Sequence, residues 1–184
     1  FLAGLPGDIG GGVVMNAGVA EAFAPREFME FVDEIQVMDY EGNIKTIDKK
    51  DLKISYRHTD GWQPGIITLV KISWPMEMDE TILQKVKEAN RTRLNKQPLD
   101  MPSCGSVFKN PPDHKAAQLI DQSGLKGFRI GDAQVSLKHA NFIVNVGKAK
   151  AKDIWEVIQH VRMTVLEKQK VSLTTEVVKL GLWN

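Results

Sequence analysis

The chain has 184 residues, of which 42% are hydrophobic and 26% are charged, and its formal net charge is +1. This composition is typical of a folded globular protein and excludes a disordered or fibrous one. The near-zero charge gives no general electrostatic reason to expect nucleic acid or a membrane as a partner, and no apolar run approaches the roughly 18 residues of a membrane helix. The single cysteine excludes an intrachain disulfide and CxxC metal sites, and it agrees with a reducing cytoplasm.

Glycine dominates the first 18 residues, FLAGLPGDIGGGVVMNAG. Because glycine adopts positive φ and lets the backbone approach a ligand, we predict a loop followed by a short buried segment. The spacing fits neither a Rossmann fingerprint nor a P-loop. The N–H groups of such a loop could form a nest for a phosphate, and the alternative is a sharp turn into a buried strand. Since the sequence opens in this motif without an initiator Met, we expect a piece of a longer protein.

Residues 33–48 have the pattern of a β-hairpin. Ile35 and Val37 alternate with polar residues, residues 41–43 supply the turn, and Ile44 and Ile47 lie on the returning strand. Residues 66–74, IITLVKISW, predict another strand.

Three later segments have helical periodicity. Residues 79–97 predict an amphipathic helix that Asp79 caps and Pro98 ends, and its apolar stripe comprises Ile82, Val86, Ala89 and Leu94. Residues 114–127 predict a shorter helix, with Gly124 at its end and Ala116, Leu119 and Ile120 facing inward. Residues 152–170 give the clearest pattern, with Ile154, Val157, Ile158, Val161 and Val165 on one face.

Residues 139–147 and 171–181 read as strands, so helices and strands alternate in the second half after a strand-rich first third. This order predicts an α+β fold in two lobes, with a boundary near residues 97–98.

The stretch YRHTD, residues 56–60, places the guanidinium of Arg57 among hydrogen-bonding groups. Arg57 could hold a carboxylate through two hydrogen bonds, or it could be a solvated surface arginine beside Tyr56. Lys138 and His139 could face a phosphate or be structural. The spacing of the histidines fits no metal site.

The stretch PSCGSVFKNP, residues 102–111, concentrates reactive groups. Cys104 has no neighbouring His or acid to activate a thiolate, so we expect it to be a small space-filling residue. Ser106 lacks a GxSxG elbow, which argues against acyl transfer, but a neutral hydroxyl can donate a proton to a strongly basic carbon. Glu176 is the only acid in LTTEVVKLG, where it either faces water or serves a site.

In order and spacing, five motifs together resemble the UDP-N-acetylenolpyruvoylglucosamine reductase (MurB) family: GLPGDIGGGVVMNAG, SYRHTD, CGSVFKNP, VSLKHANFIVN and LTTEVVKLG. The resemblance covers essentially the whole chain. It implies a cytoplasmic flavoenzyme of peptidoglycan synthesis that uses FAD and NADPH to reduce UDP-N-acetylglucosamine enolpyruvate to UDP-N-acetylmuramate. It also implies a monomer when complete. The resemblance places the general acid on Ser106, and it places stabilisation of the enolate on Arg57 and Glu176.

The same resemblance implies further site residues. Those near FAD are Gly4, Pro6, Gly7, Ile9, Gly10, Gly11, Asn16 and Arg57. Those near the substrate are Lys96, Lys109, Asn110, Lys138 and His139.

The resemblance also implies a division into three parts. Residues 1–97 would be the C-terminal part of an FAD-binding domain of the vanillyl-alcohol-oxidase type, and residues 98–172 a substrate-binding domain. Residues 173–184 would be a terminal strand that returns to the flavin side. The family has a longer N-terminal stretch, including a Gly-Ser-Asn turn at the flavin phosphates, so a non-catalytic module that binds a UDP-sugar is the alternative.

Overall fold

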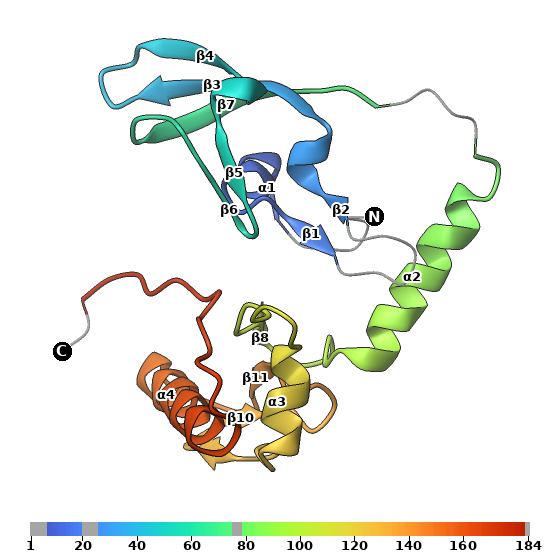
Figure 1. Cartoon of the computed structure of the whole chain (residues 1–184), viewed down its shortest axis with the longest axis vertical. Helices are drawn as coiled ribbons and strands as arrows, with labels where there is room; N and C mark the ends of the chain where they lie inside the picture. The colour runs from blue at the N-terminus through green and yellow to red at the C-terminus, as the bar shows by residue number, and fades with distance from the viewer. Residues whose placement is uncertain (1–6, 20–25, 75–78, 183–184) are drawn as a thin grey trace. The chain divides into compact units, whose positions relative to one another are not determined.

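The computed structural model describes residues 7–19, 26–74 and 79–182, and it has two compact units, residues 1–90 and 91–184 (Figure 1). The division falls within helix α2 (Ile82–Lys96). Both units mix helices with antiparallel strands, in agreement with the α+β expectation. Among the described residues, no helix is long and apolar enough to cross a membrane.

Unit 1 is built around a three-stranded antiparallel sheet in the order β4-β3-β7, whose strands lie side by side in Figure 1. These strands are β3 (Val32–Asp39), β4 (Ile44–Asp48) and β7 (Gly65–Ile72). Two short ribbons accompany the sheet: β1 (Gly18–Val19) with β2 (Arg26–Glu27), and β5 (Lys53–Ser55) with β6 (His58–Asp60). Helix α1 (Ile9–Val14) and the 3₁₀ turns η1 (Phe28–Glu30) and η2 (Lys49–Asp51) complete the unit.

The predicted hairpin is confirmed, with Ile35 opposite Ile47 in the register of β3 and β4. Ile35, Val37 and Ile47 are buried, and Gly42 takes φ +89° in the turn. Ile44, the first residue of β4, is 60% exposed, so only Ile47 of the two apolar residues predicted on the returning strand is buried.

The glycine-rich segment forms the short helix α1 where we expected a loop. Glycine is a poor helix former, so local contacts must compensate: Asp8 accepts a hydrogen bond from the Gly11 N–H at 2.6 Å, which caps the first turn. Gly12 lies against the Phe28 ring, and Val13 is buried in the core of unit 1.

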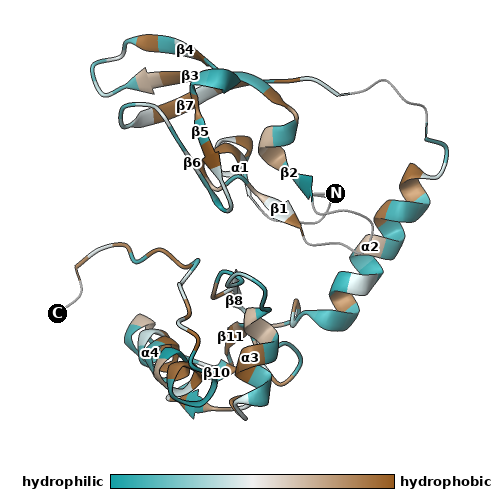
Figure 2. Cartoon of the chain, in the orientation of Figure 1, coloured by the Kyte–Doolittle hydropathy of each residue, from teal (hydrophilic) through white to brown (hydrophobic). Residues whose placement is uncertain are grey.

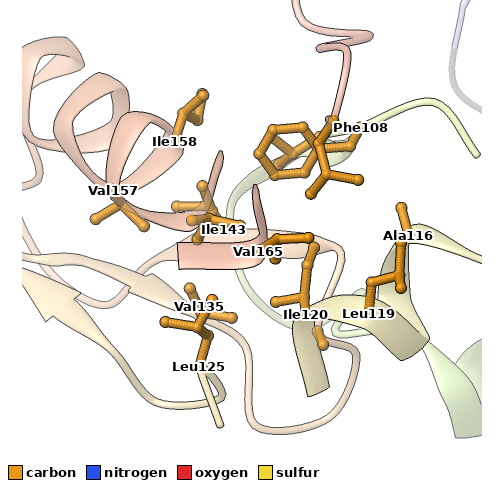
Figure 3. Close-up of a cluster of buried hydrophobic side chains, with 14 of the residues drawn as sticks. Phe108, Ala116, Leu119, Ile120, Leu125, Val135, Ile143, Val157, Ile158 and Val165 are labelled. Atoms are coloured by element: carbon orange, nitrogen blue, oxygen red, sulfur yellow. The ribbon is translucent and has the colours of Figure 1, made fainter. Parts of the chain in front are cut away.

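Unit 2 contains a four-stranded antiparallel sheet in the order β8-β11-β10-β9. Its strands are β8 (Ser103–Ser106), β9 (Arg129–Ile130), β10 (Ala133–Val135) and β11 (Phe142–Asn145). Helices α3 (Ala116–Gln122) and α4 (Ala151–Gln169) supply buried side chains to the same core, in which Figure 3 shows Phe108 among aliphatic groups. The predicted inward residues of α3 are buried, as are Val157, Ile158, Val161 and Val165 of α4.

Helix α2 forms where the sequence predicts it, but its apolar stripe is not buried. Ile82 and Leu94 are 52% and 57% exposed, and no residue of the helix is buried within the described part of the chain. Figure 2 colours most of this helix as hydrophilic, with apolar residues at intervals. Periodicity creates an apolar face, but burial also requires a facing surface, which the described residues do not supply.

The predicted last strand is reduced to one isolated bridge between Phe108 and Thr175. Leu173 is buried in the core of unit 2, whereas Val178 and Leu180 are 69% and 83% exposed. A composition rich in β-branched residues therefore does not by itself produce a strand here, because residues 171–181 find a pairing partner at only a few positions.

Candidate functional site

Ser106 lies at the end of strand β8, opposite Phe142 of β11. The preceding Gly105 has φ +79°, a left-handed conformation that favours glycine because it carries no Cβ. Ser106 is partly exposed, while Val107 and Phe108 after it are buried. The segment thus leaves the sheet with its hydroxyl-bearing residue at the surface and its apolar residues in the core.

Glu176 lies on the backbone segment that pairs with the residues after Ser106. The Glu176 N–H donates to the Val107 carbonyl at 2.8 Å, and the Lys109 N–H donates to the Thr174 carbonyl at 2.9 Å. In this register Glu176 stands opposite Val107, one position from Ser106. The fold therefore brings together two predicted catalytic residues that are far apart in the sequence.

A surface hollow of about 600 Å³ lies on unit 2 between α3 and the loop before β11. Two predicted substrate residues, Lys138 and His139, line it. The other lining residues are Ala117, Gln118, Asp121, Gln122, Lys126 and Ala140. Lys126 forms an ion pair with Asp121 at 2.7 Å, so the hollow combines amides, an imidazole and ammonium groups. This set of donors suits a phosphate or a nucleotide base.

Asn110 connects the Ser106 segment to this hollow. Its side-chain oxygen accepts a hydrogen bond from the Ala116 N–H at 3.0 Å, at the start of α3. An acceptor at this place satisfies one of the unpaired N–H groups of a helix start and fixes where α3 begins. Asn110 thereby positions the helix that forms one wall of the hollow.

Lys138 also contacts the end of α2. Its ammonium group donates to the Leu94 carbonyl at 2.6 Å, in the last turn of a helix whose final residue is Lys96. Lysine side chains stabilise the unpaired carbonyls of helix ends. The contact brings the turn that carries Lys96 next to the loop that carries Lys138.

His139 is half-buried, and burial is the main cause that lowers the pKa of its imidazole, with the charge of Lys126 acting in the same direction. Its Nδ1 accepts a hydrogen bond from the Asn141 N–H at 3.3 Å. A neutral imidazole that accepts at Nδ1 carries its proton on Nε2. His139 therefore offers the hollow a neutral hydrogen-bond donor.

Cys104 is exposed, so the expectation that it fills space beside Gly105 is wrong. Desolvation of the thiol raises its pKa, which agrees with the expected lack of thiolate activation.

A polar cluster in unit 1 holds Arg57 and Asn16. Arg57 donates to the Gly18 carbonyl at 2.6 Å and pairs with Glu27 at 3.8 Å, and Asn16 donates to Glu27 at 2.6 Å. The Arg57 side chain is only 13% exposed, so the alternative of a solvated surface arginine is wrong. Both Arg57 and Asn16 have positive φ, at 57° and 40°, which is uncommon for residues other than glycine and often marks functional positions.

Gly18 shows why this cluster needs a residue without a side chain. A Cβ there would lie 2.6 Å from the Arg26 carbonyl oxygen and 2.9 Å from Nη1 of Arg57. Of the predicted flavin residues, Ile9 and Gly11 are exposed and Gly10 is partly exposed, while Gly7 takes φ +149°. Gly4 and Pro6 lie outside the described residues. In the part of the chain that the structure describes, no three His, Cys, Asp or Glu residues form a group suited to a metal ion.

Known proteins share this architecture. Residues 97–180 match the family model described as UDP-N-acetylenolpyruvoylglucosamine reductase, C-terminal domain. Over 182 residues, or 98% of this chain, the sequence is 43% identical to the UDP-N-acetylenolpyruvoylglucosamine reductase of Pediococcus pentosaceus. The chain belongs to the UDP-N-acetylenolpyruvoylglucosamine reductase family.

Two further comparisons agree. The reductase of Listeria welshimeri is 44% identical over 98% of this chain. The crystal structure of UDP-N-acetylenolpyruvylglucosamine reductase (MurB) from Thermus caldophilus matches 95% of the chain with a TM-score of 0.77 and 36% identity. The chain spans 59% and 60% of the two curated relatives and 61% of the solved MurB chain.

The MurB resemblance that the five motifs indicate is thus confirmed. Sequence reasoning did not single out Glu27, Gln118, Lys126 or Asn141, which the structure places in the cluster, the hollow and the Ser106 segment. Only Asn141 carried a signal, because it lies inside the VSLKHANFIVN motif. The others carried no sequence signal of a site: Gln118 and Lys126 lie within the predicted helical segment 114–127, and Glu27 belongs to none of the motifs.

Proposed function

We propose that this chain is the part of a cytoplasmic UDP-N-acetylmuramate dehydrogenase that binds the UDP-sugar and protonates it. The complete reaction is the FAD-dependent reduction of UDP-N-acetylglucosamine enolpyruvate by NADPH. The observation that carries the proposal is the hydrogen bond from the Glu176 N–H to the Val107 carbonyl, because it brings the backbone of Glu176 to the residue that follows Ser106. The names of the relatives support the reaction class.

Ser106 donates the proton in this proposal. Reduction of the enolpyruvyl double bond leaves negative charge on the substrate, and a nearby hydroxyl can neutralise it. In this proposal a protonated Glu176 stabilises that charge by donating a hydrogen bond, and Arg57, assigned to the same role by the family resemblance, does so by its positive charge; fixed polar groups act without the cost of reorientation.

The hollow on unit 2 binds the nucleotide portion of the substrate. Lys138 supplies a charge to the diphosphate, and neutral His139 supplies a directional hydrogen bond. Lys96 and Asn110 belong to the same binding region in this proposal, Lys96 through the contact of Lys138 with the last turn of α2 and Asn110 through its bond to the start of α3. Lys109 directly precedes Asn110 on the same segment.

Unit 1 contributes to FAD binding. FAD, when bound, carries the reducing equivalents from NADPH to the substrate. The fit is supported by Thr59, whose buried hydroxyl has no hydrogen-bonding partner among the described residues, since a buried group of this kind requires one from a ligand or water. Gly7, Ile9, Gly10, Gly11 and Asn16, with Gly4 and Pro6, provide the remaining contacts in this proposal.

The alternative is a module that binds a UDP-sugar without catalysis. It is favoured for the isolated chain by one observation, namely that the chain spans only 59% of the first relative.

The two proposals differ in a simple experiment on the purified 184-residue chain. The chain is incubated with FAD and desalted, its visible absorption is recorded, and turnover with NADPH and UDP-N-acetylglucosamine enolpyruvate is measured. Retained flavin with turnover supports the reductase. A colourless protein that binds UDP in calorimetry supports the binding module, and failure to bind either ligand contradicts both.

Lys138→Ala tests the hollow in the same calorimetry. We expect UDP affinity to fall about tenfold, because a charge-assisted hydrogen bond to the diphosphate is lost. The matched control is Lys152→Ala, which removes an ammonium group that is 77% exposed on α4. Equal affinities of the two variants would place the nucleotide elsewhere.

A further inference from the structure

Asn141 is a buried residue, 5% exposed, between the loop that lines the hollow and strand β11. Its side-chain oxygen accepts from the Phe108 N–H at 3.0 Å, and its side-chain nitrogen donates to the Phe108 carbonyl at 2.9 Å. One amide therefore satisfies both backbone polar groups of a buried residue. Buried backbone groups need such partners, and leaving them unsatisfied is costly.

The main chain of Asn141 extends this contact toward Ser106. Its carbonyl accepts from the Val107 N–H at 2.9 Å. The pairing of β11 with β8 is irregular between Phe142 and Val144, so the regular ladder does not fix this region alone. The side-chain amide of Asn141 takes the place of a neighbouring strand for Phe108, and its main-chain carbonyl does so for the N–H of Val107.

Asn141 also bonds to His139, which lines the hollow. Its N–H donates to Nδ1 of His139 at 3.3 Å, which holds the imidazole in the tautomer that presents Nε2–H. The same residue thus bonds to the loop of the hollow on one side and to the segment of Ser106 on the other.

We propose that Asn141 is a positioning residue, whose side-chain amide sets the backbone path of Val107–Phe108 and thereby the place of Ser106 relative to the loop that carries His139. The catalytic importance of Ser106 rests on the proposed function, whereas the hydrogen bonds between Asn141 and Phe108 do not depend on it. Asn141 does not react; it acts through the residues that it holds.

The test uses the isotope-labelled chain and NMR hydrogen exchange of individual amides. In Asn141→Ala, we expect the Phe108 amide to lose at least about tenfold of its protection, and the Ser106 amide resonance to shift. The matched control is Asn145→Ala on the same strand, because Asn145 accepts from Gly147 and Ala149 and has no side-chain bond to Phe108. It should leave the Phe108 protection within about twofold.

Asn141→Asp gives a sharper test within a single folded sample. A protonated carboxyl can accept from the Phe108 N–H and donate to its carbonyl, as the amide does, whereas a carboxylate can only accept. Burial raises the pKa of such a carboxyl. We therefore expect wild-type protection of Phe108 at low pH and loss of protection as the pH rises through that pKa. Because ionisation of a buried carboxyl can also weaken the whole fold, the expected loss is confined to Phe108 and its neighbours, while amides elsewhere in unit 2 keep their protection.

The proposal is overturned if Phe108 keeps its protection in Asn141→Ala, if Asn145→Ala loses as much, or if Asn141→Asp shows no dependence on pH beyond that of the wild type. Calorimetry of the wild type with UDP is run in parallel. Absence of UDP binding contradicts the proposed function, while the exchange data decide the role of Asn141 independently.

Discussion

The two units hold their candidate residues by different physical means. In unit 1, Arg57 is fixed by its own side chain, which reaches the Gly18 carbonyl and Glu27 from a backbone at positive φ. In unit 2, Ser106 and Glu176 are fixed through their backbones, because Ser106 pairs with Phe142 of β11 and the Glu176 N–H bonds to the Val107 carbonyl. A charged group that is largely withdrawn from water needs polar partners, whereas a partly exposed hydroxyl can bond to water and is placed by its backbone.

Phe108→Ala should have the largest effect on this comparison. The side chain is 2% exposed in the core of unit 2, and its loss should cost about 3–5 kcal/mol of unfolding free energy. Segment-resolved hydrogen–deuterium exchange in denaturant should show the loss in residues 91–184 alone. Met163→Ala, which removes a side chain from a residue 69% exposed on α4, is the control. A similar loss of protection in unit 1 would mean that the two units do not unfold independently.

Asn16→Ala should have an intermediate effect, on unit 1. Asn16 is fully buried, and its side chain also donates to the Ser55 carbonyl and accepts from the Met29 N–H. Leaving these groups without a partner should cost about 1–3 kcal/mol, measured by the same exchange experiment.

The control for Asn16 is Asn43→Ala, because Asn43 is an exposed asparagine of the same unit that bonds to Asp39. If both variants were equally stable, the polar cluster around Arg57 would not support unit 1.

Protonation of Asp79, which lies just before helix α2, should have the smallest effect on stability. Hydrogen bonds from Lys85 and Thr81 lower its pKa to about 2. Because the pKa of Asp79 is lower in the folded than in the unfolded state, its ionised carboxylate stabilises the fold. That stabilisation is complete above the ordinary pKa of 3.8 and is lost as the pH falls toward about 2. NMR titration of the Asp79 carboxyl and of the Thr81 amide should show this midpoint. Asp79→Ser keeps a cap acceptor and should abolish the titration of the Thr81 amide; persistence of that titration would assign it to another group.

Much of the fold could be predicted from the sequence. The inward faces of α3 and α4 follow from the 3.6-residue period, and the hairpin of β3 and β4 follows from its alternation and turn. The predictions failed where a pattern needs a partner that local sequence does not reveal. The stripe of α2 stays exposed, and residues 171–181 pair at a single bridge.

The residues of the candidate site also fall into two groups, those that the sequence motifs single out and those that only the structure reveals. The motifs identified Ser106, Glu176, Arg57 and Lys138, because residue type and spacing are properties of the sequence. They did not identify Glu27 or Asn141, whose roles depend on hydrogen bonds across 11 and 33 positions of the chain.

By itself, the sequence determined the element types, the family and the reactive groups, since these depend on local periodicity and on motifs in order. Only the tertiary structure decided which groups meet. It set Glu176 beside the Ser106 segment, withdrew Arg57 from solvent and gave Phe108 an asparagine in place of a strand. The physical reason is that buried polar groups must find partners wherever the folded chain supplies them.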